Sequence, residues 1–234
     1  MKNHMRLVVL SLCFVVFTPL CAQTYEVGLI AGGSNVIGDV GSTRYISPNE
    51  IAVGAIFKWN RSNRHSFRAS FIATTLSGND LDSDDISREL RGLDYSYGFY
   101  EASVGIEYTF WDWELYSGTR QFTPYLYAGV AGFRQVSYRL NDLGTDLRSY
   151  DNAYGVAIPL TLGVKYTLTT RLVLAAEVGA RFAFTDNLDG SNPTGDFKDR
   201  EDLQFGNLNN NDWYMMSGIT LTYTFGRMPC YCNF

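Results

Sequence analysis

The stretch that decides the fold runs from Val156 to Phe184, and its first half reads VAIPLTLGVKYTL over residues 156–168. Starting from Val156, every second residue of this half is apolar or aromatic, and the residues between are small or polar. After Thr169 and Thr170 the pattern restarts as LVLAAEVGARFAF over residues 172–184. Because side chains alternate faces along a strand, each half has one apolar face. Two such strands joined by a very short turn predict an antiparallel hairpin.

The length of these two strands separates a membrane barrel from a soluble sandwich. Ordinary strands run about 5–6 residues, and a tilted strand needs roughly 9–11 residues to cross a bilayer. Both halves hold period two beyond that length. The face opposite the apolar one carries Lys165, Glu177, Arg181 and glycines. A soluble sandwich would turn that face to water, whereas a membrane barrel turns the apolar face to lipid and keeps a narrow polar interior. We interpret the hairpin as part of a membrane barrel.

The same alternation predicts eight strands and a regular rhythm of connections. The strands are Tyr25–Gly33, Asn49–Trp59, His65–Ser77, Tyr97–Phe110, Phe122–Tyr138, the two strands of the hairpin, and Trp213–Phe225. Connections 60–64 and 169–170 are short and 111–121 is intermediate, while 34–48, 78–96, 140–153 and 186–212 are long and polar. Outer-membrane barrels have short periplasmic turns and long outer loops. We therefore predict an all-β fold: an eight-stranded antiparallel transmembrane β-barrel of the outer-membrane type, with both mature termini in the periplasm.

The first residues have the pattern of a secretory signal peptide. Lys2 and Arg6 are basic, residues 7–20 are apolar, and Ala22 is a small residue suited to cleavage. Cys21 leaves a lipoprotein alternative, but Leu20 stands where a lipobox has Gly or Ala. The expected organisation is a signal peptide over residues 1–22, a barrel over 23–226 and a periplasmic C-terminal tail over 227–234.

Charge and hydropathy narrow the function classes. Without Lys2 and Arg6, the mature chain has 17 basic and 24 acidic side chains, a formal charge of −7. Such an acidic chain argues against nucleic-acid binding. Since no later segment is a long apolar run, membrane insertion must occur through strands.

Five charged residues are predicted to point into the barrel and form an ion network: Glu101, Glu107, Lys165, Glu177 and Arg181. Buried charges must be paired to be tolerated. Two interpretations are open, an ion path and a structural plug that holds the wall in register. An eight-stranded barrel is just wide enough for its own side chains, which favours the plug.

We expect no catalytic set, no cofactor and no metal ion. His65 is the one histidine of the mature chain and lies at a short turn assigned to the periplasmic rim. A general base must lie within hydrogen-bond reach of the group it activates, and lipid-modifying barrel enzymes place theirs near the outer rim or lipid face. There is no His/Cys cluster for zinc. The acidic stretch 79–85 lacks the glycine and terminal Glu of a calcium loop, which favours a solvated loop.

The tail GRMPCYCNF, residues 226–234, continues past the last predicted strand. Pro229 prevents a simple extension of that strand. Cys230 and Cys232 are too close in sequence for an unstrained disulfide, and either could pair with a partner. A free end and a docking segment for a periplasmic partner both remain open. The candidate docking residues are Arg227, Pro229, Cys230, Tyr231 and Cys232.

Four segments resemble a known family: GGSNVIGD at 32–39, PYLYAG at 124–129, IPL at 158–160 and GRxPCY at 226–231. They are similar to the PorG-like outer-membrane barrels of the Bacteroidota type IX secretion system, from whose pattern Cys232 departs. The resemblance implies a non-catalytic component of that protein transport machinery. Its expected partners are outer-membrane lipid, the periplasmic ring of a lipoprotein and a soluble subunit, and the secretion translocon. The alternative is a stand-alone surface or adhesin-type OmpA/OmpX-like barrel, motivated by the long loops. A lipid-modifying barrel enzyme ranks last.

Overall fold

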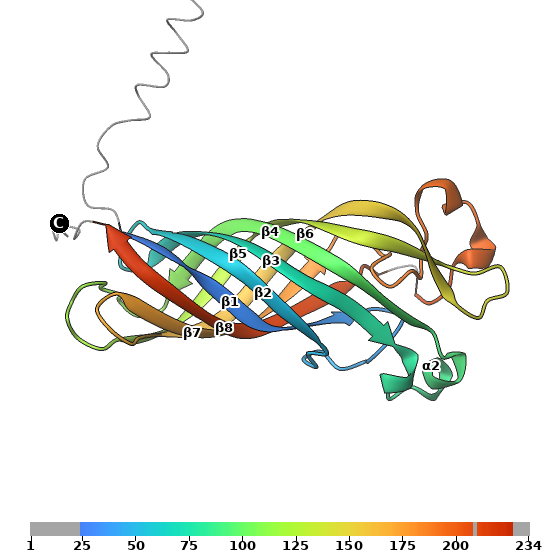
Figure 1. Ribbon diagram of the computed structural model, residues 1–234, viewed down its shortest axis with the longest axis horizontal. Coiled ribbons are helices and arrows are strands. Elements are labelled where there is room, and N and C mark those ends of the chain that lie inside the picture. The colour runs from blue at the N-terminus through green and yellow to red at the C-terminus, as the bar shows by residue number, and fades with distance from the viewer. Residues whose placement is uncertain (1–23, 208–209, 227–234) are drawn as a thin grey trace, which may run out of the picture.

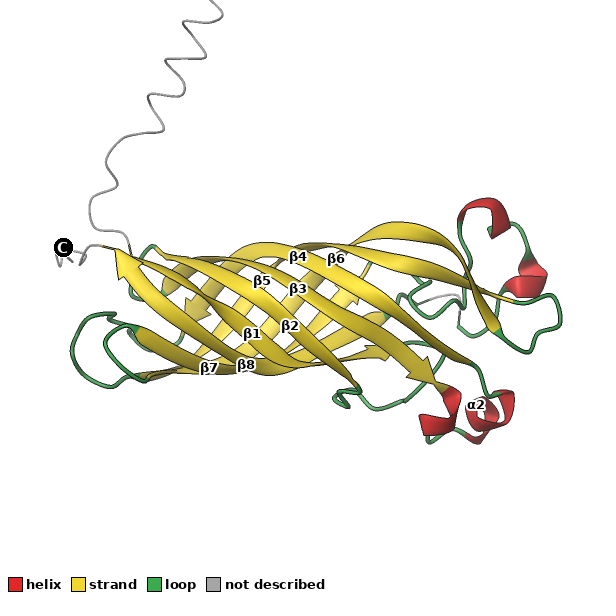
Figure 2. Cartoon of the chain, viewed as in Figure 1, coloured by secondary structure: helices red, strands yellow, loops and turns green. Residues whose placement is uncertain are grey.

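The computed structural model describes residues 24–207 and 210–226, which form a closed antiparallel barrel of eight strands (Figures 1 and 2). Each strand pairs with its neighbours in sequence, and the last pairs with the first. The strands are β1 (Thr24–Ile37), β2 (Glu50–Asn60), β3 (His65–Asn79), β4 (Asp94–Thr109), β5 (Phe122–Leu140), β6 (Leu147–Thr167), β7 (Leu172–Ala183) and β8 (Trp213–Gly226). The predicted fold class is confirmed. The expected signal peptide and tail lie outside the described residues.

The strands differ from the sequence prediction chiefly at one end of the barrel, where they run further than expected. The predicted long connection 140–153 is wrong, because β6 begins at Leu147 and the turn from β5 covers just residues 141–146. Backbone pairing with β5 continues there through a register shift between Ser137 and Tyr138. Most side chains of residues 147–153 are at least partly exposed, so no apolar face marks this part of the strand. Alternating hydropathy therefore ends before the strand does.

The two ends of the barrel differ in the length of their connections. Thr24 pairs with Gly226, so both ends of the described barrel lie together. The connections at that end span residues 61–64, 110–121 and 168–171. The opposite end carries residues 38–49, 80–93, 141–146 and 184–212. The short helices lie in these connections (Figure 2): η1 (Asp80–Asp82), α2 (Ile86–Arg91), η2 (Gly195–Phe197) and η3 (Glu201–Leu203). No described helix is long and apolar enough to cross a membrane.

Aromatic side chains fill the barrel beneath the long connections. Phe99, Phe133 and Tyr214 have ring centroids 5.0–5.9 Å apart and are buried. At the other mouth, Trp113 and Leu115 of the 110–121 connection fold inward against Val173. Apolar side chains thus close the interior near both ends, and a polar layer lies between them.

Candidate functional site

The outer surface of the barrel is an apolar belt. Leu162 on β6 and Leu221 on β8 are 55% and 46% exposed, whereas their neighbours Thr161 and Thr222 are buried inside. The same alternation places exposed large apolar residues on the outside of every strand except β7, whose outward side chains are mostly partly exposed. So large a continuous apolar surface is rare on a soluble monomer and marks contact with another apolar phase. The belt is the lipid-facing surface of a membrane barrel.

Aromatic side chains mark both edges of this belt. At the end of the barrel where Thr24 pairs with Gly226, Tyr25 stacks between Phe57 and Phe225, with ring centroids 5.9 and 5.7 Å apart. Towards the long connections, Phe182 on β7 packs against Trp213 on β8 at 5.3 Å. Aromatic girdles at two levels around an apolar band are typical of barrels that cross an outer membrane. Together they indicate which part of the wall lies in lipid.

All five charged residues expected in the interior are placed there by the structure and are buried. Glu107 on β4 lies at the centre of the larger group. One of its oxygens is 2.8 Å from Lys165 Nζ and the other is 2.7 Å from Lys58 Nζ. Arg68 approaches the same carboxylate at 4.0 Å. One carboxylate thus connects side chains from β2, β3, β4 and β6.

Glu177 on β7 belongs to the same layer. Arg68 donates two parallel hydrogen bonds to its oxygens, at 2.7 and 2.8 Å, and the Tyr125 hydroxyl donates a third at 2.6 Å. Bidentate arginine–carboxylate pairs combine strength with a fixed geometry. Through Arg68, the Glu107 and Glu177 groups form one continuous network across the lumen.

Glu101 and Arg181 form a second group, closer to the aromatic layer. The Tyr214 hydroxyl donates to Glu101 at 2.8 Å, and Arg181 Nε lies 3.5 Å from the same oxygen. Arg181 also donates to the Gly179 carbonyl at 2.8 Å. The five predicted residues therefore fall into two groups and do not form a single cluster.

Three interior charges escaped the sequence prediction: Glu26, Lys58 and Arg68. Lys58 stands between Phe57 and Trp59, and Arg68 stands between Phe67 and Ala69, so the alternation of β2 and β3 already turns both inward. Glu26 accepts hydrogen bonds from Asn60 at 2.9 Å and Thr222 at 2.6 Å. With these additions, the four carboxylates named here are matched by four cations. The alternation of inward and outward positions, which identified the other five residues, also identifies these three.

The interior arrangement is suited to support and not to transport. Lys165 Nζ lies 4.8 Å from the Trp113 ring, and the Arg68 guanidinium lies 4.6 Å from the Tyr127 ring. These two cations are thus each held by a carboxylate on one side and an aromatic ring on another. Because the charged layer lies between apolar groups near each mouth, the side chains fill the lumen as expected for eight strands.

Buried carboxylates join the long connections at the opposite end. Asp189 accepts the backbone N–H groups of Asp39 and Val40. Asp80 accepts the N–H groups of Gly41 and Leu93 and two bonds from Arg91 of α2. These contacts tie the connections 38–49, 80–93 and 184–212 to one another. The long connections therefore pack into one layer at this end. In the acidic stretch 79–85, predicted as a solvated loop, Asp82, Asp84 and Asp85 are exposed as expected and Asp80 is buried.

The structure places His65 at the start of β3 with its side chain exposed. Its Nδ1 lies 3.3 Å from the Ser62 hydroxyl, and its ring lies 5.2 Å from that of Tyr108. Within residues 24–207 and 210–226, no group of three or more His, Cys, Asp or Glu side chains is placed to hold a metal ion. The candidate docking residues Arg227, Pro229, Cys230, Tyr231 and Cys232 lie outside the described residues.

Comparison with known protein families identifies the family of this chain. The family model described as "Domain of unknown function (DUF6089)" matches residues 5–234. The chain belongs to this DUF6089 family. No curated protein matches this chain.

Among solved structures, this DUF6089 chain is similar to the N-terminal β-barrel domain of Pseudomonas aeruginosa OprF. The identity is 12%, the TM-score is 0.46, and the match covers 87% of this chain and 97% of that one. Neisserial surface protein A is similar at 11% identity, a TM-score of 0.44 and the same two coverages. Ail of Yersinia pestis follows at 10% identity and a TM-score of 0.41, also covering 87% and 97%. The likeness is distant, and the barrel assignment rests on the strand register of this chain itself.

Proposed function

We propose that this protein is a non-catalytic outer-membrane barrel of the type IX protein secretion machinery, anchoring the periplasmic ring near the translocon. The observation that carries the membrane part is the closed barrel with an exposed apolar belt between two aromatic girdles. Since every backbone group of a closed barrel is paired within the wall, such a barrel can lie in lipid without an unsatisfied edge.

The filled lumen favours an anchoring role and argues against a channel. The Glu107 and Glu177 networks and the Phe99 layer occupy the interior with buried side chains. What a barrel without a channel offers to a secretion complex is a fixed attachment point in the membrane. The secretion part of the proposal rests on the resemblance of segments 32–39, 124–129, 158–160 and 226–231 to the PorG-like family.

The orientation follows from the connections. Long connections in outer-membrane barrels face outward and short turns face the periplasm. This orientation puts both ends of the described barrel, Thr24 and Gly226, and the connection 110–121 on the periplasmic side. Partners of the periplasmic ring would then approach the end of the barrel that carries Gly226 and the aromatic girdle formed by Tyr25, Phe57 and Phe225.

Co-purification tests this proposal. An affinity tag inserted next to the exposed Asp199 in the outer connection 184–212 leaves the tail free. After gentle solubilisation of outer membranes, the tagged protein should recover the lipoprotein and soluble ring subunits. A variant lacking residues 227–234 should fold normally and recover much less of both. Recovery of a clean monomer from the intact chain would contradict the anchoring role.

The packed outer end favours a second candidate, a stand-alone surface barrel. Asp189 and Asp80 hold three outer connections in one layer, as a recognition surface requires. Shortening the 184–212 connection should then abolish binding to the recognised surface and leave secretion unchanged. Loss of secretion with intact surface binding would favour the first candidate instead.

A further inference from the structure

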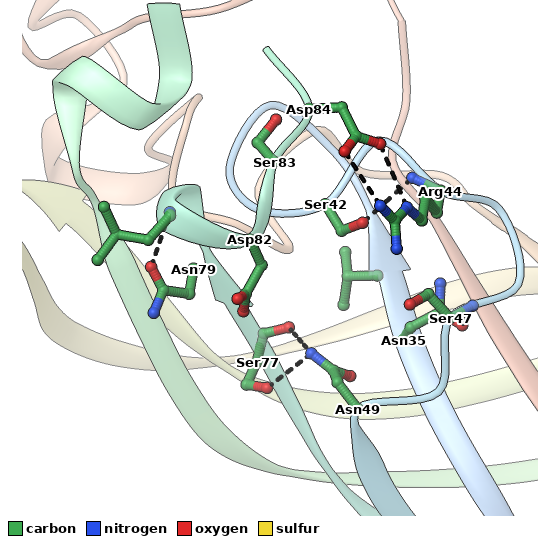
Figure 3. Close-up of a pocket in the computed structure, with 12 residues that line it drawn as sticks. Asn35, Ser42, Arg44, Ser47, Asn49, Ser77, Asn79, Asp82, Ser83 and Asp84 are labelled. Carbon is green, nitrogen blue, oxygen red and sulfur yellow. Dashed lines mark hydrogen bonds and ion pairs between the residues drawn. The ribbon is translucent and has the colours of Figure 1, made fainter. Parts of the chain in front are cut away.

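A polar cavity of about 440 Å³ opens at the outer end between two connections (Figure 3). One wall comes from residues 35–49, which cover the end of β1 and its connection to β2. The other comes from residues 77–84, at the end of β3 and through η1. The cavity is separate from the charged interior and from the periplasmic end, and it does not depend on the secretion role.

Two bridges hold the walls of the cavity in place. Arg44 donates from Nε and Nη2 to the two carboxylate oxygens of Asp84, at 3.2 and 3.1 Å. Asn49 donates from Nδ2 to the carbonyl and the hydroxyl of Ser77, at 3.1 and 3.0 Å. Both pairs are drawn in Figure 3 and connect one wall to the other. A cavity fixed in this way is preorganised, which lowers the entropic cost of binding.

The individual walls are also fixed from within. The buried Asn35 side chain donates to the Tyr45 carbonyl at 3.1 Å and accepts from the Ser47 N–H at 3.3 Å. On the other wall, Asn79 Oδ1 accepts from the Leu81 N–H at 2.9 Å. These contacts set the direction of the side chains that remain available to a ligand.

Several polar groups in the cavity have no protein partner within the described part of the chain. They are the Asp82 carboxylate, the Asn79 amide N–H₂, the Asn49 side-chain carbonyl and the Ser47 hydroxyl. Figure 3 shows Asp82 and Asn79 on one wall and Asn49 and Ser47 on the other. Both walls therefore contribute polar groups to the cavity.

The lining selects for a ligand that is neutral and rich in hydroxyl groups. Arg44 contributes one positive charge and Asp82 and Asp84 contribute two negative charges, so the lining disfavours phosphate and sulfate. Pockets for drug-like ligands are mostly apolar, whereas serine, asparagine and aspartate dominate here. Leu81, which is 66% exposed, supplies the apolar contact that the C–H face of a sugar ring requires.

We propose that this cavity binds a neutral saccharide at the cell surface. Asp82 accepts from adjacent ring hydroxyls, Asn79 donates to them, and Asn49 and Ser47 hold the opposite edge. A carboxylate and an amide in one lining suit a ligand with several hydroxyls, since each hydroxyl both donates and accepts. Because the site is open to water and small, the expected Kd is on the order of 1 mM.

Saturation-transfer difference NMR tests the proposal on the full chain in dodecylphosphocholine micelles, which carry no sugar. The probes are D-glucose, D-galactose, D-mannose, L-fucose and N-acetyl-D-glucosamine, each titrated singly. At least one should give a saturable signal. Asp82→Ala should weaken it about tenfold or more, because a hydrogen bond to a charged group is lost.

Asp199→Ala is the matched control, since Asp199 is exposed and lies outside the cavity; it should leave binding unchanged. Ser47→Tyr is a second variant, which fills the cavity and should abolish the signal. The heat-dependent gel shift of folded barrels reports whether each variant is folded. The proposal is overturned by no saturable signal from any of the five sugars, or by a signal that survives both cavity variants. Displacement of the sugar by inorganic sulfate would also overturn it.

Discussion

Arg68 and Glu177 are 109 positions apart in the sequence and meet inside the barrel through two parallel hydrogen bonds of 2.7 and 2.8 Å. Tyr125 donates a third bond to Glu177 at 2.6 Å. The contact joins β3, β5 and β7 across the lumen. Because both charges are buried, removal of either leaves the other poorly compensated.

Removal of one member of this pair should destabilise the barrel strongly. Arg68→Met leaves the Glu177 charge buried with the Tyr125 hydroxyl as its remaining partner. We expect a loss of about 3–5 kcal/mol in the free energy of unfolding, measured by urea titration in lipid vesicles with tryptophan fluorescence. The double variant Arg68→Met/Glu177→Gln should recover most of that loss. Equal destabilisation in the single and double variants would show that the charge pair is not the cause.

Close approach of two strands at Gly105 provides a second prediction. A Cβ atom at Gly105 would lie 2.2 Å from the Ala128 carbonyl oxygen and 2.6 Å from Gly129 Cα. Since these are backbone atoms of the neighbouring strand, Gly105→Ala must push β4 and β5 apart. We expect a large loss of the folded form in refolding assays read by the heat-dependent gel shift. Gly98→Ala on the same strand meets nothing within 4 Å and should fold like the parent. Normal folding of Gly105→Ala would be incompatible with this strand spacing.

Acidification should tighten the outer connections. Burial raises the pKa of the Asp186 carboxyl to about 6, and the charges of Asp189 and Asp39 act in the same direction. Burial also raises the pKa of Asp189 and of Asp212. The folded layer therefore holds protons that the unfolded chain releases near pH 4. The stability that these protonated carboxyls contribute is fully present below about pH 4 and is lost as the pH rises through about 6.

Hydrogen exchange measures this dependence on the amides of Leu188 and Val40, after correction for the intrinsic rate. Protection should be higher at pH 5 than at pH 7, and Asp186→Asn should reduce the difference. Asp199→Asn, at an exposed site of the same connection, should leave it unchanged. Protection that is constant or increases with pH would contradict the assignment.

The filled lumen predicts a barrel that does not conduct. Reconstituted in planar bilayers, the protein should show no stable conductance steps. Trp113→Ala, which removes the indole over Lys165, should also remain closed, because the Glu107 network and the Phe99 layer stay in place. Discrete steps from the parent protein would show that the interior rearranges into a pore.

Strand parity made a large part of the barrel predictable from the sequence. Period two is a local property of each strand, so it sorted lipid-facing from interior residues before any partner was known. It failed at residues 147–153, where solvent and polar connections surround the strand and neither face needs to be apolar. The alternation also turns Lys58 and Arg68 to the interior. The predicted ion network was wrong in leaving both out.

The sequence by itself determined that eight strands form a wall with an apolar outside and charged side chains within. The tertiary structure alone decided which charges meet: Arg68 with Glu177, Lys58 and Lys165 with Glu107, and Arg181 with Glu101. It also decided that the outer connections pack into one layer with a polar cavity beside it. The reason is that alternation depends on neighbours in the chain, whereas contacts across a lumen depend on the register in which the closed barrel brings distant strands together.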